Sequence, residues 1–294
     1  VLVGRLIEQV TGKTWDAAIR ERLSLPLGLT HTVTLPEEAL LYRAAVGHVG
    51  EDIPTRAPVW VLPRSAGPAG LITCTVRDLL GFARLHLTGG LAPDGARLLS
   101  AESTAAMADK HADLPDKHTL GDSWGLGWIR YLWDGQRVIG HDGSTIGQAA
   151  FLRVVPELGF AVALLTNGGN ARDLYQDLFR EIFAEVAAVA MPEPLTPPAE
   201  PVSVDVTPWL GTYERASVRM EVLADGPTLR TTVTGPLAEL IDKPSDEFPM
   251  IPVGPDLFVV RPPETETWNA VLFYTLPTGA RYVHHGGRAT PKVS

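Results

Sequence analysis

The sequence predicts an α+β protein in which helices flank an antiparallel sheet, followed by a small all-β domain. Residues 124–165 contain two pairs of strand-like runs joined by tight turns, and amphipathic helical segments precede and follow them. Five of the eleven residues 191–201 are proline, which cannot continue a helix, and alternating apolar residues resume beyond them. We therefore expect a first domain at 1–190, a proline-rich linker at 191–206 and a β-barrel-like domain at 207–294.

The first part of the chain carries helix signals. Apolar residues recur at helical spacing over residues 2–10 and stop at Gly12, with no capping residue before them. A second helix is expected to begin after Thr14, which serves as its cap. Thr75 and Asp78 have the spacing of a capping box, which predicts a third helix through the apolar residues that follow.

From Trp124 onward the apolar period becomes that of strands. Residues 134–135 are an Asp-Gly pair between two strand-like runs, which predicts a hairpin with a primed turn. A second hairpin is expected to join residues 149–155 to residues 160–165. The spacing from Asn170 to Asp173 is that of a capping box, and a long amphipathic helix is expected after it.

Composition excludes several classes of protein. The 294 residues include 25 Lys and Arg against 34 Asp and Glu, a formal net charge of −9, so we expect no nucleic-acid partner. No run of 18 apolar residues occurs, so we expect no membrane-spanning segment. The single cysteine, Cys74, cannot form an internal disulfide or a multi-cysteine metal site. The sequence does not decide the compartment.

Residues 121–125 fit the GxSxG pattern of a nucleophilic serine at a strand-to-helix turn. The surroundings do not fit, because a polar segment precedes Ser123 and a strand pattern follows it. A glycine-rich turn is therefore the favoured interpretation of this segment, and a hydrolase whose nucleophile is Ser123 is the least favoured of three functional hypotheses.

The adjacent His284 and His285 point to opposite faces of a predicted strand and are not expected to bind a metal together. The other histidines, including His86, are expected on the surface.

A second candidate lies at Gly140-His141-Asp142-Gly143-Ser144. Neighbours on a strand point to opposite faces, so His141, Asp142 and Ser144 cannot form a hydrogen-bonded relay. His141 and Gly143 do share a face, and Gly143 leaves room for a ligand to approach the backbone. The amide of Ser144 could then meet a developing oxyanion. The plain alternative is a structural or solvated strand histidine.

Several short motifs occur in an order typical of one enzyme family: residues 1–12, PLGLTHT at 26–32, GLITCT at 70–75, WGLGW at 124–128, GHDG at 140–143 and LLTN at 164–167. Together they resemble the serine β-lactamase-like family, which includes class C β-lactamases, D-alanyl-D-alanine peptidases and related esterases. In this comparison HxG, at residues 141–143, takes the place of the KTG found in other members of the family. The match covers residues 1 to about 190, and the remainder resembles the small lipocalin-like β domain that some members carry.

The resemblance implies a β-lactamase/transpeptidase-like fold and a serine hydrolase that forms an acyl-enzyme on an ester or amide. It implies that His141 assists proton transfer or binds a substrate carboxylate, and that the Ser144 amide donates to the oxyanion. Asp142, Gly143 and Thr145 are expected to bind substrate. The expected partner is a small-molecule ester, lactam or D-amino-acid peptide, and neither a cofactor nor a metal is expected.

The family's SxxK and YxN motifs do not occur anywhere in the 294 residues. The sequence also lacks an initiator methionine and a cap before its first helix. We therefore expect an N-terminally truncated, incomplete version of the fold, and we expect the chain as written to be inactive because the nucleophile is absent. The alternative is a non-catalytic homologue that binds a ligand or peptide.

Overall fold

The chain forms two compact units, of which the first contains residues 1–112 and 123–191 and the second contains residues 113–122 and 192–294. The segment 113–122 clusters with the C-terminal strands, and residues 192–206, which the sequence predicts as a linker, also belong to the second unit. The computed structural model describes the chain except residues 51–52, 61, 225 and 241–243.

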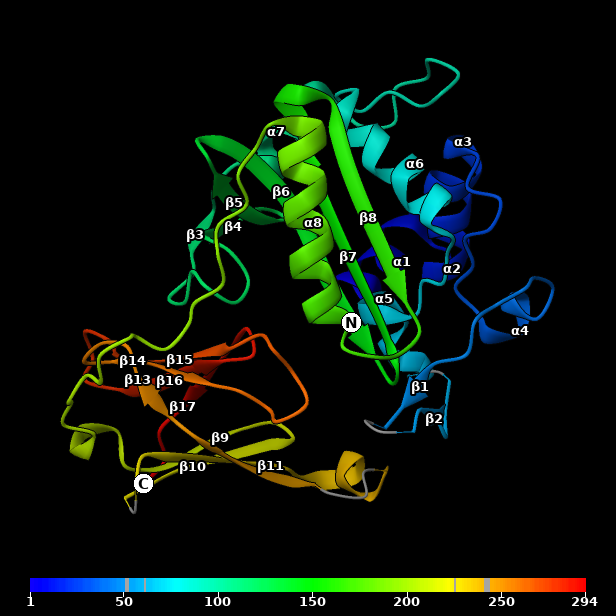
Figure 1. The fold of residues 1–294 in the computed structure, drawn as a ribbon. Coiled ribbons are helices and arrows are strands. Elements are labelled where there is room, and N and C mark those ends of the chain that lie inside the picture. Colours follow the sequence, from blue (N-terminus) through cyan, green and yellow to red (C-terminus); the bar gives the residue numbers. More distant parts are fainter. Residues whose placement is uncertain (51–52, 61, 225, 241–243) are drawn as a thin grey trace. The chain divides into compact units, whose positions relative to one another are not determined.

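The first unit contains the α-helices, which Figure 1 labels α1 to α8, and several shorter helical segments between them. They are α1 (Leu2–Thr11), α2 (Trp15–Ile19), the π-helix η1 (Arg20–Ser24), α3 (Leu25–Leu27), α4 (Pro36–Ala39), the 3-10 turn η2 (Arg64–Ala66), α5 (Gly67–Gly70), α6 (Val76–Leu87), α7 (Ala101–Ala108) and α8 (Ala171–Ala187). None of the helices in the described part of the chain is both long enough and apolar enough to cross a membrane.

Most strands of the first unit belong to a six-stranded antiparallel sheet of order β3-β4-β5-β6-β7-β8. This arrangement, with helices on both sides, confirms the predicted α+β class. A separate two-stranded ribbon pairs β1 (His48–Val49) with β2 (Thr55–Arg56). The strands of the large sheet are β3 (Ala112–Asp113), β4 (Ser123–Trp124), β5 (Ile129–Trp133), β6 (Gln136–Thr145), β7 (Gln148–Val155) and β8 (Phe160–Thr166), with the 3-10 turn η3 (Pro156–Leu158) between the last two.

Both predicted hairpins are confirmed. Asp134 and Gly135 have φ angles of 49° and 76°, so the β5–β6 turn is of the primed type whose twist suits paired strands. The β7–β8 hairpin pairs Val155 with Phe160 across its turn. Because the side-chain period of a strand is two, the register of these hairpins decides which face of the sheet each residue occupies.

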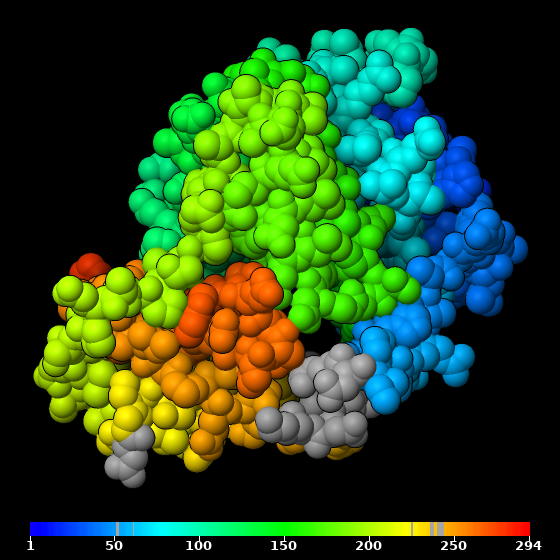
Figure 2. Space-filling model, viewed as in Figure 1, coloured from blue at the N-terminus to red at the C-terminus, as the bar shows by residue number. Residues whose placement is uncertain are grey.

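The two faces of the sheet are covered by different helices. Helix α8 lies over β6 and β7 in Figure 1, and its side chains cover that face in the space-filling view of Figure 2. Three aromatic residues of α8, Tyr175, Phe179 and Phe183, are buried there. On the other face, Ala83 of α6 belongs to a core cluster with Leu152 of β7 and other residues of the sheet.

The helices begin at the positions that the capping signals predict, but the side chains of Asp78 and Asn170 do not make the capping hydrogen bonds expected of them. Thr14 caps α2, and Thr75 accepts a hydrogen bond from the backbone N–H of Asp78, as predicted. The Asp78 carboxylate instead accepts from the backbone of His31 and the hydroxyl of Thr32, so it ties a distant loop to α6. At α8, the Asn170 side chain makes no capping hydrogen bond, so this half of the predicted capping box is not formed.

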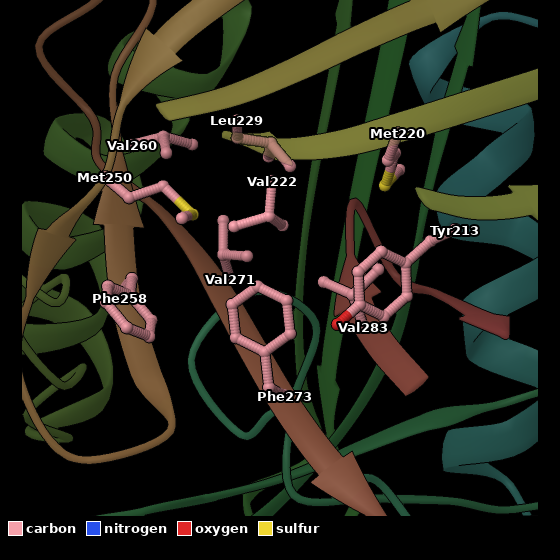
Figure 3. Close-up of a cluster of buried hydrophobic side chains, with 10 residues drawn as sticks. All are labelled: Tyr213, Met220, Val222, Leu229, Met250, Phe258, Val260, Val271, Phe273 and Val283. Atoms are coloured by element: carbon pink, nitrogen blue, oxygen red, sulfur yellow. The ribbon is translucent and has the colours of Figure 1, made fainter. Parts of the chain in front are cut away.

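The second unit consists mainly of two antiparallel sheets with one shared core. The ten buried residues of this core are drawn in Figure 3 and include the aromatic side chains of Tyr213, Phe258 and Phe273. One sheet contains β9 (Gly211–Arg215), β10 (Val218–Leu223), β11 (Thr228–Val233) and β12 (Ser245–Pro249); the other contains β13 (Ile251–Pro252), β14 (Leu257–Val260), β15 (Asn269–Thr275), β16 (Arg281–His285) and β17 (Arg288–Pro291); the 3-10 turns are η4 (Thr207–Trp209) and η5 (Gly235–Leu240).

The segment 113–122 packs into this second unit through a buried acid. Asp116 accepts hydrogen bonds from the backbone N–H groups of His118 and Thr119, and its other carboxylate oxygen lies 3.7 Å from Nδ1 of His284 on β16. Burial raises the pKa of Asp116, but the contacts with His284, Thr119 and His118 outweigh it and hold that pKa below its usual value. The contact between Asp116 and His284, which are far apart in sequence, therefore links the segment to β16.

One histidine contradicts the expectation of surface placement. His86 of α6 is 5% exposed and meets the rings of Phe82 and Trp128 edge-on, with centroids 5.2 and 4.8 Å away. Burial without a hydrogen-bond partner on either ring nitrogen disfavours the charged form and lowers the pKa of His86 to about 4.

The buried imidazole predicts a loss of stability in mild acid. From about pH 6.5 down to about pH 4 the unfolded chain binds a proton that the folded chain excludes, so the free energy of unfolding falls by up to about 1.4 kcal/mol per pH unit. We expect His86→Leu to lose this part of the slope when chemical denaturation is measured at pH 7 and pH 5. The exposed His118 supplies a control, His118→Leu, and equal slopes for both variants would contradict the prediction.

Candidate functional site

Within the part of the chain that the structure describes, the second half of strand β6 has one edge with no paired strand. In a two-residue hairpin the residues flanking the turn form a hydrogen-bonded pair, so Gln136 directs its backbone N–H and C=O toward β5. Every second residue after it does the same, including Asp142 and Ser144. In the described part of the chain, β6 pairs with β5 only as far as Gly140 but with β7 as far as Thr145. The backbone groups of Asp142 and Ser144 therefore face the open side.

His141 lies at the beginning of this open edge and is exposed. Its Nδ1 is 2.6 Å from the backbone oxygen of Asp142, and its ring meets Trp124 of β4 edge-on at a centroid distance of 5.7 Å. Two contacts from different strands thus hold the imidazole. The ring is exposed, so it is accessible to a ligand.

Gly143, Ser144 and Thr145 line a cavity of about 970 Å³. His141 is not among the lining residues; it precedes them on the same strand and shares a face with Gly143 and Thr145. A Cβ atom added to Gly143 would have only Ala150 nearby, at 4.0 Å. The backbone at Gly143 is therefore open to close approach by a ligand. Ser144 has its side chain on the opposite face, so the chemistry it offers at the open edge is that of its amide.

The opposite walls of the cavity come from the helical part of the first unit. They include His31 and Thr32, which Asp78 holds by hydrogen bonds, and the segment of α5 and the loop after it. Cys74 also lines the cavity. Burial, with a smaller contribution from the Asp78 carboxylate, raises the pKa of the Cys74 thiol to about 11, so the thiol stays protonated and is a poor nucleophile near neutral pH.

Asp142 occupies the other face of the sheet from His141 and Gly143. Its side chain is 10% exposed, and its two carboxylate oxygens accept hydrogen bonds from Arg153 of β7 at 2.6 Å and Arg172 of α8 at 3.1 Å. Burial raises the pKa of Asp142, but the two guanidinium charges outweigh it and keep that pKa below its usual value. The carboxylate is thus turned to the α8 face of the sheet and is already paired with two guanidinium groups.

Sequence reasoning did not find Arg153 and Arg172, because their partner is separated from them by 11 and 30 residues. A charged residue within the otherwise apolar β7 run is the one signal that could have indicated Arg153. Ser123 is buried at 2% exposure and accepts a hydrogen bond from Arg130, so it is not presented to a ligand. In the described residues, no group of three or more His, Cys, Asp or Glu side chains is arranged to hold a metal ion.

The beta-lactamase family model matches residues 1–186, which is more than half of the chain. The chain belongs to the beta-lactamase family. This result agrees with the resemblance found in the short sequence motifs, and it places β6, with its open edge, inside the matched region.

This beta-lactamase-family chain is similar in sequence to two named proteins. Penicillin-binding protein 4 of Amycolatopsis lactamdurans is 52% identical over 218 residues, which cover 73% of this chain and 57% of that protein. Unguisins hydrolase ungD' of Aspergillus campestris is 28% identical over 174 residues, which cover 57% of this chain and 32% of that protein.

Among solved structures, the crystal structure of SurE with D-Leu aligns with a TM-score of 0.66 and 25% identity, over 99% of this chain and 65% of that one. An octameric penicillin-binding protein homologue from Pyrococcus abyssi shares the fold, with a TM-score of 0.50 and 17% identity over 99% of this chain and 63% of that one. The chain spans less than two thirds of the length of each of these relatives.

Two glycines of β6 give a matched test of the site in this beta-lactamase-family chain. A Cβ at Gly140 would collide with the carbonyl oxygen of Leu152 and lie 2.9 Å from Cδ of Arg153, whereas a Cβ at Gly143 is unobstructed. We expect Gly140→Ala to lower the free energy of unfolding by about 2 kcal/mol, as overpacking does. Gly143→Ala should change it by less than about 0.5 kcal/mol. Chemical denaturation of both variants checks this, and equal losses would contradict it.

Proposed function

We propose that residues 140–145 form one wall of an acyl-transfer site in a serine hydrolase that makes an acyl-enzyme on an ester or amide. The SxxK and YxN segments of such a site would lie outside the 294 residues. The observation that carries the proposal is the open edge of β6, where an exposed histidine, a glycine and an outward-directed amide lead into a large cavity. Membership of the beta-lactamase family supports it.

Each residue of this wall has a chemical part to play. The Ser144 N–H donates a hydrogen bond to the oxygen that becomes negatively charged when the nucleophile attacks, and one such donor accelerates acyl transfer by about 10²–10³-fold. Gly143 leaves room for the substrate backbone to reach that amide. His141 assists proton transfer or binds a substrate carboxylate, and Thr145 contacts the substrate farther along the strand. Asp142 contributes its backbone oxygen, which accepts a hydrogen bond from Nδ1 of His141.

The names of the relatives suggest the class of substrate. Penicillin-binding protein 4 is named for binding a lactam, and SurE was crystallised with D-Leu. A lactam contains the amide carbonyl that a nucleophile attacks, and D-Leu has the α-carbon configuration of a D-amino-acid peptide. We therefore propose a lactam or D-amino-acid ester or amide as the substrate of the whole protein.

A fluorescent penicillin tests the proposal directly. We expect it to label the protein expressed from the whole reading frame that contains these residues, and not residues 1–294 alone. His141→Gln in the whole protein should slow labelling by about 10²-fold, the usual contribution of a proton-transfer group. The exposed His118 provides the control, His118→Gln, which should label at the wild-type rate. Absence of labelling by penicillin and of hydrolysis of D-leucine esters would refute the proposal.

A second candidate function is supported by the absence of SxxK and YxN from the 294 residues. In that case the cavity binds a ligand or peptide without turning it over. Binding of a D-amino-acid peptide by the whole protein, measured by calorimetry without release of product, would favour this function over the first.

A further inference from the structure

We infer that Asp142, Arg153 and Arg172 are positioning residues that act on His141 through one peptide group. The inference concerns the same site, and its catalytic consequence rests on the proposed function. Asp142 is the connecting residue because its side chain lies on the α8 face of the sheet while its backbone oxygen lies at the open edge.

Asp142, Arg153 and Arg172 form an ion cluster on the α8 face of the sheet, and side chains from β5, β7 and α8 contact or belong to it. Arg153 of β7 is 1% exposed; its guanidinium lies 4.4 Å from the ring centroid of Tyr131 on β5 and 4.8 Å from that of Tyr175 on α8. Arg172 adds a second guanidinium to the same carboxylate. Buried ion pairs and ring contacts of this kind have few alternative arrangements, since loss of one partner leaves a charge unpaired in a dry site. The Asp142 side chain is therefore fixed in position.

The backbone of Asp142 transmits this position to His141. A carbonyl oxygen only accepts hydrogen bonds, so the 2.6 Å contact with His141 requires the hydrogen to be on Nδ1. In the neutral imidazole Nε2 then carries the lone pair and is the nitrogen able to take a proton. A rotation of the peptide group after Asp142 would move the accepting oxygen and remove the preference for this tautomer.

The arrangement explains why a charged cluster stands at this point of the sheet. Beyond Gly140 the strand loses its β5 partner, so the ladder no longer orients the backbone of Asp142 on that side. The ladder with β7 continues to Thr145 and holds the other edge of the strand, and the ion cluster on the α8 face adds a side-chain constraint at Asp142, one residue after His141 and two before Ser144. The same anchor thus orients the histidine tautomer and the amide that follows it.

The test reads the tautomer of His141 in the 294-residue chain by ¹⁵N–¹H NMR, with His141→Gln to assign the signals. We expect the Nδ1–H form to predominate in the wild type. Arg172→Met removes the guanidinium that is 34% exposed and should shift the ratio of the tautomers toward Nε2–H by about fivefold, the factor that corresponds to one net hydrogen bond. Arg172→Lys keeps a positive charge at this position and should therefore shift the tautomer ratio less than Arg172→Met does.

Arg180→Met is the matched control, because Arg180 lies on the same helix with a side chain that is 27% exposed and pairs with Asp177. It should leave the tautomer ratio unchanged. In the whole protein Arg172→Met should lower kcat for the D-amino-acid ester by about tenfold, with KM changed less than about twofold, as expected when a catalytic group is displaced.

Two results separate this inference from the proposed function. An unchanged tautomer ratio in both Arg172→Met and Asp142→Asn, with both variants folded by circular dichroism, would overturn the positioning role whatever the activity. A tautomer shift in a protein that fails to react with penicillin or D-amino-acid esters would uphold the positioning role and refute the hydrolase proposal.

Discussion

The register of strand β6 is the constraint on which the rest of the site depends. A two-residue turn with positive φ at Asp134 and Gly135 fixes Gln136 opposite Trp133. Since side chains and backbone groups both alternate with a period of two, this one turn decides that His141 and Gly143 share a face and that the Ser144 amide faces the open edge. A slip of one residue would exchange the buried and the exposed sets.

The strand carries opposite chemistry on its two faces. On one face, β6 passes from the apolar cluster around Ile139 to an exposed histidine and a cavity wall. On the other face, the same few residues bury a carboxylate between two guanidinium groups under α8. A buried ion cluster is weak evidence for stability, because desolvation opposes the attraction. We propose that this cluster instead helps to fix the position of the β6 backbone at Asp142, where pairing with β5 has ended.

The second unit has a different physical basis. Its two sheets enclose a core of aromatic, aliphatic and methionine side chains, with Tyr213 donating its hydroxyl hydrogen to the backbone oxygen of Trp209. The segment 113–122 joins this unit through Asp116 and His284. The chain therefore leaves and re-enters the first unit between β3 and β4, and β4 carries Trp124, the residue that contacts His141.

The amino-acid sequence alone determined the α+β class, both hairpins of the large sheet, the starts of the main helices and the family. These features rest on local signals, such as the Asp-Gly turn, the threonine caps and the apolar period, and on short motifs in a characteristic order. Only the tertiary structure decided that Asp142 is paired with Arg153 and Arg172, that Asp78 ties a loop instead of completing a capping box, and that His86 is buried. Each of these depends on groups brought together from distant parts of the chain, and neither residue spacing nor local propensity contains that information.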